Sequence, residues 1–166
     1  MKKPIMLALV LTISTCLCAQ IEVFKIVGKN SEEFSHQYGF GTFLKLSVPV
    51  NQGSDAITGE IGIMGLDGYS AGFVVLKAGY RYTLNRSGYG LYVEPQAGYA
   101  AGNDTYKDVA GVSTVAAVGY LFQPIGNVRL DVGLRFENIF TAYGSYSFVG
   151  LRIAHNFSLF RRSADY

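Results

Sequence analysis

The residues best suited to chemistry in this sequence are charged side chains that alternate with apolar ones. The clearest example is the segment 128–137, where Arg129, Asp131, Arg135 and Glu137 share one parity. Successive side chains of a strand point to opposite faces, so a strand here would carry all four on one face. Acids and bases enclosed together can form salt bridges or line a path for ions. The spacing therefore predicts either a salt-bridged plug or a narrow ion path.

The same alternation in other segments places further charged residues on this face. A solvated face usually carries Lys and Glu more densely than this one, whose charged positions are interleaved with Gly, Ala, Ser and Gln. We therefore expect these side chains to fill a narrow barrel lumen as a salt-bridged plug, with the ion path as the alternative. The predicted lumen network has six basic and four acidic members: Lys45, Glu60, Lys77, Arg81, Glu94, Arg129, Asp131, Arg135, Glu137 and Arg152.

Candidates for catalysis are few. The two histidines are His36 and His155. His155 and Ser158 are three positions apart and point to opposite faces of a strand, which prevents a hydrogen-bonded dyad. Ser35 lies beside His36, with only the acidic pair at 32–33 available to orient it. We predict no catalytic residue, no metal and no cofactor; a lipid-modifying barrel enzyme is the alternative.

The N-terminal residues 1–19 have the pattern of a cleaved export signal. Lys2 and Lys3 give a positive start, and an apolar run follows over 5–17. Ala19 is the small residue before the predicted cut, which leaves Gln20 as the new N-terminus. A spanning helix would need roughly 20 apolar residues, so this run is too short for one.

Both cysteines, Cys16 and Cys18, lie inside the predicted signal, so the mature chain would have no disulfide. Lipidation at Cys16 is an alternative, although Thr15 is bulkier than the residue that usually precedes a lipidated cysteine. Removal of the two signal lysines also balances the basic and acidic residues at twelve each. The mature net charge is then near zero, and no nucleic-acid partner is expected.

Short strand-forming segments separated by turn clusters make up the remainder. The chain is rich in Tyr, Phe and Gly, has no Trp and is only 16% charged, a composition typical of an all-β domain. Turn clusters such as Gln123-Pro124-Ile125-Gly126-Asn127 separate the segments. The pattern predicts strands at 21–28, 37–49, 56–66, 71–84, 88–101, 110–122, 127–139 and 145–159, of which the first fits either register.

The alternation does not by itself decide whether the apolar face points into or out of the barrel. Most predicted strands reach the roughly 9–11 residues that a tilted membrane crossing needs. Aromatic residues near the ends of the apolar faces match the girdles of membrane barrels: Tyr80, Tyr82, Tyr99, Tyr120, Phe122, Phe136 and Phe157. We predict an eight-stranded antiparallel up-and-down transmembrane β-barrel, with a soluble secreted lipocalin-like binder as the alternative.

Four of these segments resemble strands of the small OmpA/OmpX-like outer-membrane β-barrels: 75–82, 91–99, 130–137 and 148–154. The resemblance covers roughly residues 37–159. It implies a monomer in the outer membrane with enclosed charges and both termini in the periplasm. Contact with outer-membrane lipid, and with periplasmic chaperones and the barrel-assembly machinery during biogenesis, is implied as well. The role implied is structural or surface interaction, with a narrow pore as an alternative.

The implied topology divides the chain into a barrel and a tail, and its connections into inner turns and outer loops. The barrel would span 20–160, followed by a short polar tail at 161–166, which departs from the usual aromatic end of such chains. Inner turns are predicted at 50–55, 85–87 and 123–126. Outer loops are predicted at 29–36, 67–70, 102–109 and 140–144, and they are short compared with those of adhesive members of the group.

Overall fold

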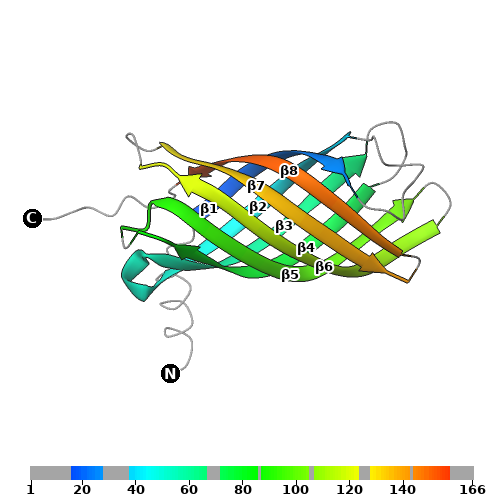
Figure 1. Cartoon of the computed structure of the whole chain (residues 1–166), viewed down its shortest axis with the longest axis horizontal. Helices are drawn as coiled ribbons and strands as arrows, with labels where there is room; N and C mark the ends of the chain where they lie inside the picture. Colours follow the sequence, from blue (N-terminus) through cyan, green and yellow to red (C-terminus); the bar gives the residue numbers. More distant parts are fainter. Residues whose placement is uncertain are drawn as a thin grey trace, which may run out of the picture.

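The computed structural model describes residues 16–27, 38–66, 72–85, 87–104, 107–123, 128–142 and 144–157. These residues form a single closed barrel in which every strand is antiparallel to both neighbours and β1 pairs with β8 (Figure 1). A 3-10 turn at Asn51–Gly53 joins β2 to β3. The strands are β1 (Cys16–Ile26), β2 (Tyr38–Val50), β3 (Asp55–Leu66), β4 (Gly72–Thr83), β5 (Gly90–Asp104), β6 (Lys107–Leu121), β7 (Val128–Thr141) and β8 (Gly144–Phe157). The predicted eight-stranded up-and-down barrel is confirmed.

The bounds of β2 to β8 fall within three residues of the predicted ones, but two predictions need correction. The outer loop predicted at 102–109 is wrong, because the β5–β6 ladder continues from the Gly102–Val109 pair to the Asp104–Lys107 pair. Gly and Asn in this stretch favour turns, yet pairing keeps them extended. The first strand begins at Cys16 rather than at 21, so it includes four residues of the predicted signal.

The stagger of the strands sets the width of the lumen. Paired residues followed once round the barrel from Cys16 lead through Ser47, Thr58, Gly79, Gln96, Val115, Glu137 and Phe148 to Ile26. The path returns ten residues further along β1, so the shear is 10, and the strands are tilted as Figure 1 shows. A closed barrel of eight tilted strands has an interior that side chains can fill.

The two faces of the barrel wall have opposite chemistry. Side chains of one parity point outward and are mostly apolar; Leu76 is 63% exposed and Ile63 60%. Side chains of the other parity point inward and include nearly all the described charges, of which Arg152 is fully buried. Charges buried inside and apolar side chains outside are the reverse of a water-soluble barrel. No helix among the described residues is long and apolar enough to span a membrane.

Candidate functional site

The structure places nine of the ten predicted network residues inside the barrel, each buried from solvent. The side chain of the tenth, Arg129, lies outside the described residues. They are carried by β2, β3, β4, β5, β7 and β8, and the stagger of the strands brings their ends together in two groups.

The first group, here called the Glu94 group, surrounds one carboxylate. Lys45 Nζ lies 2.5 Å from Glu94 Oε1, and Arg81 Nη2 lies 3.0 Å from Glu94 Oε2. Arg152 Nη2 is 3.2 Å from the same oxygen. Arg81 also contacts Asp131 at 2.7 Å. The Glu94 group therefore combines three cations with two anions.

Tyr92 lies within the Glu94 group and links two of its members. Its hydroxyl donates to Asp131 and accepts from Arg152. The Arg81 guanidinium lies 4.0 Å from the centre of the Tyr92 ring, and that of Arg152 lies 5.3 Å from it. The ring thus offers both cations a cation–π contact in addition to their carboxylates.

The second group, here called the Arg135 group, has the opposite balance. Arg135 Nη1 lies 3.0 Å from Glu22 Oε2 and 2.8 Å from Glu60 Oε1, while Nη2 lies 2.8 Å from Glu137 Oε2. Lys77 joins Glu60 at 3.2 Å and Glu137 at 3.0 Å. Two cations and three anions meet here.

The net charges of the Glu94 group and the Arg135 group are opposite and equal. Together their described side chains contain five basic and five acidic residues, so the enclosed charge is zero. The Gln96 amide nitrogen connects the groups, because it donates to Glu94 at 2.8 Å and is 3.4 Å from Glu60. A buried charge is tolerated where an opposite charge lies close by, and each of these ten groups has one within 3.2 Å.

A second part of the interior is apolar, which the alternation of charges did not reveal. Phe43 lies at the boundary between the charged and the apolar parts of the interior. Its ring centre is 5.0 Å from Lys77 Nζ and 4.9 Å from the Arg135 guanidinium, and the ring also packs in the apolar cluster. Beyond Phe43, toward the end of the barrel opposite the start of β1, the interior is packed with Phe24, Ile26, Met64, Leu66, Phe73, Val75, Ala100, Val109, Ile139 and Phe148. The described lumen is thus an ionic layer beside an aromatic and aliphatic one.

Sequence reasoning missed five members of the network, two of which, Thr58 and Ser113, donate hydrogen bonds to its carboxylates. Glu22 was missed because the first strand fitted either register, although Gln20 and Glu22, both now buried inside, are two residues apart. Tyr92 and Gln96 were assigned to the polar face but were left out of the network because they carry no charge. A count of buried hydrogen-bonding groups on that face, rather than of charges, would have included them.

The structure describes only part of the candidate catalytic residues. Among the residues it describes, no group of three or more His, Cys, Asp or Glu side chains is placed to hold a metal ion. His155 is partly buried, in the outward-facing register of β8. The other candidates, Ser35, His36 and Ser158 among them, lie outside the described residues.

A glycine on β6 makes room for the Tyr92 hydroxyl, and this gives a first prediction. A methyl group at Gly119 would overlap that hydroxyl and would lie 2.9 Å from the Val132 carbonyl. We expect Gly119→Ala to lower the free energy of unfolding by about 1–3 kcal/mol, the usual cost of overpacking. Gly59→Ala is the control, because nothing lies within 4 Å of its added methyl group. Equal urea midpoints for the two variants in detergent would contradict the described packing.

These features define a class of fold: a closed eight-stranded up-and-down barrel with apolar residues outside and charged residues inside has the architecture of the small outer-membrane barrels. Among solved structures the chain is similar to Neisserial surface protein A (NspA), with a TM-score of 0.67 and 12% identity over 88% of this chain and 97% of that one. It is also similar to Ail, the attachment invasion locus protein of Yersinia pestis, with a TM-score of 0.54 and 13% identity over 86% and 97%. The predicted resemblance is confirmed for the fold.

No family model matches the sequence. No curated protein matches it either. At 12–13% identity the likeness to the two solved barrels is one of backbone architecture.

Proposed function

We propose that this chain is an exported outer-membrane β-barrel with a closed lumen and a structural or surface-interaction role without catalysis. The observation that carries the proposal is the inverted arrangement of the wall. Side chains such as Leu76 and Ile63 face outward, while five acids and five bases are enclosed. In water this arrangement would expose a large apolar surface, whereas in lipid the same surface contacts hydrocarbon and the arrangement is stable.

Closure of the barrel supports the same environment. Because β1 pairs with β8, no strand edge is left with unpaired amide groups, as a β-structure in hydrocarbon requires. A soluble lipocalin-like binder would instead turn its apolar face inward around a ligand cavity. In this barrel the interior holds the ionic network instead.

The test of this environment is fractionation of the full chain. We expect it in the outer-membrane fraction, soluble only with detergent, and migrating differently on a denaturing gel before and after boiling. N-terminal sequencing of the mature protein would test the predicted cut after Ala19, which lies within β1. Recovery of the folded barrel in detergent-free buffer would overturn the proposal.

The proposed topology places the start of β1 and the end of β8 at the periplasmic side. The turns near 51–54, 84–89 and 122–127 lie at that end, and the other four connections face outward. The short outer connections are where a surface interaction would occur, in line with the names of the two similar barrels, a surface protein and an attachment protein. We propose a monomer contacting lipid, with periplasmic chaperones and the barrel-assembly machinery as partners during biogenesis.

A second prediction separates the closed barrel from a pore. The Glu94 and Arg135 groups fill the lumen on one side of Phe43, and the apolar cluster fills it on the other. An ion would have to cross both layers. We expect the refolded protein to show no stepwise conductance in planar bilayers at 1 M salt. Steps of uniform size that persist after repurification would support the pore instead.

A further inference from the structure

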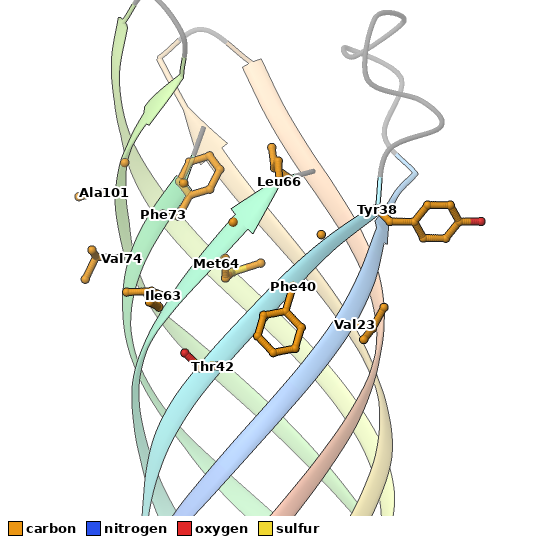
Figure 2. A pocket seen from close by; sticks show the side chains of 14 residues that line it. Val23, Tyr38, Phe40, Thr42, Ile63, Met64, Leu66, Phe73, Val74 and Ala101 are labelled. Atoms are coloured by element: carbon orange, nitrogen blue, oxygen red, sulfur yellow. The ribbon is translucent and has the colours of Figure 1, made fainter. Parts of the chain in front are cut away.

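The outer face of the barrel is hollowed over β2 to β5, at the end opposite the start of β1. The hollow has a volume of about 1200 Å³. Figure 2 shows Phe40 and Tyr38 projecting beside it from β2, with Val23 on β1 and Val74 on β4 also at its margins. It lies outside the ionic lumen and is largely apolar.

The hollow exists because two outward positions lack a side chain. Gly65 on β3 pairs with Phe40 on one side and with Gly72 on the other. Gly72 pairs with Asn103 on β5, and the outward residue two positions before Asn103, Ala101, is small and lines the hollow. Elsewhere on these strands the outward positions carry residues such as Ile63 and Leu76. A row of missing side chains on a lipid-facing wall leaves space that hydrocarbon must fill, because an empty or wet apolar space is unfavourable.

One cation lies at the margin of this hollow. Among the charged side chains that the structure describes, Lys25 alone is not buried. It points outward on β1, two residues from Val23, and its Nζ lies 5.8 Å from the Tyr38 ring centre. A lysine on the lipid side of a barrel is tolerated near the headgroup layer and gains most from an anionic partner there.

We propose that this hollow binds one acyl chain of a phosphorylated lipid of the outer leaflet, with the lipid phosphate held by Lys25. The apolar floor at Gly65 and Gly72 accepts the chain, and the adjacent ammonium group supplies the charge complementarity. The inference rests on the proposed membrane orientation, which places this end of the barrel in the outer leaflet. It adds a specific lipid contact that a purely passive wall would lack.

The test uses the refolded full barrel in detergent micelles and native mass spectrometry. The probes are dimyristoylphosphatidic acid and dimyristoylglycerol, which has the same chains without the phosphate. Gly65→Leu fills the hollow; the nearest atom to an added Cβ is the Phe40 carbonyl oxygen at 3.9 Å, so the wall tolerates the change. Gly59→Leu is the matched control on the same strand, where an added Cβ meets nothing within 4 Å.

We expect the wild-type protein and Gly59→Leu to retain one phosphatidic acid molecule, and Gly65→Leu to bind it at least tenfold more weakly. Lys25→Gln should reduce the preference for phosphatidic acid over dimyristoylglycerol to near unity, whereas Lys25→Arg should keep it. Equal binding by Gly59→Leu and Gly65→Leu would overturn the proposal. An excess of inorganic phosphate should not displace the lipid; displacement would show an ion site without an acyl-chain site. Because every variant is first checked for heat-modifiable migration, loss of the barrel is distinguished from loss of the lipid.

Discussion

Replacing Arg135 with methionine is expected to lower the free energy of unfolding by about 3–5 kcal/mol, the typical cost of breaking a buried ion pair. The guanidinium contacts Glu22, Glu60 and Glu137 at 2.8–3.0 Å, and all three carboxylates are buried. Methionine fills a similar volume without charge. Lys77 alone would then face the carboxylates of the Arg135 group, which would have to ionise without adequate partners or take up protons.

The measurement is the urea midpoint of the refolded barrel in detergent, followed by heat-modifiable migration. Leu134→Met is the control, because Leu134 is the adjacent residue of β7 and faces outward, 55% exposed. Adding Glu22→Gln to Arg135→Met removes one of the stranded charges, so the double variant should regain part of the loss. An unchanged midpoint for Arg135→Met would show that the network does not hold the barrel together.

Replacing Glu94 with glutamine should be as damaging, since it removes one of the two anions of the Glu94 group. Lys45, Arg81 and Arg152 all lie within 3.2 Å of the Glu94 carboxylate. Only Asp131 would remain to balance three enclosed cations. The expected loss is again about 3–5 kcal/mol, because glutamine keeps the shape but not the charge.

Replacing an acid of each group in turn tests whether the charge balance of the group determines the loss of stability. Glu137→Gln should cost less than Glu94→Gln, because Arg135 and Lys77 would keep Glu60 between them and Arg135 would also keep Glu22. The same urea titration ranks the two variants. If Glu137→Gln proved the more damaging, the balance of charge within each group could not be what determines stability.

Much of the fold could be read from the sequence because alternation is strong where the wall has one polar and one apolar face. In β7, Asp131, Arg135 and Glu137 alternate with Leu134 and Phe136, which sets both the strand and its register. The register divides the side chains between two faces. The sparse, mixed polar face, the aromatic residues near the strand ends and the strand lengths then predicted that the charged face points inward. What alternation cannot provide is which charges meet, because the pairing of Arg135 with Glu22 and Glu60 depends on a shear of ten residues around the whole barrel.

The apolar layer of the lumen explains the other failures. Phe24 and Ile26 face inward on β1, so this strand is hydrophobic on both faces and its register was ambiguous. The inward face was taken as polar throughout, whereas Phe73 and Phe148 pack there edge to face. A barrel wall needs hydrophobic residues outside for lipid, but its interior needs only filled volume, which aromatic rings supply as well as paired ions.

The ladder between β1 and β8 has a consequence for how the molecule is made. It joins Gln20 to Ala154 and Ile26 to Phe148, positions near opposite ends of the sequence. A nascent chain that has not yet reached β8 therefore has two open borders, at β1 and at β7, that no bilayer interior can solvate. We therefore expect insertion into the bilayer to be coupled to the pairing of β1 with β8. A deletion within 144–157 would then prevent closure of the whole barrel rather than remove one strand from it.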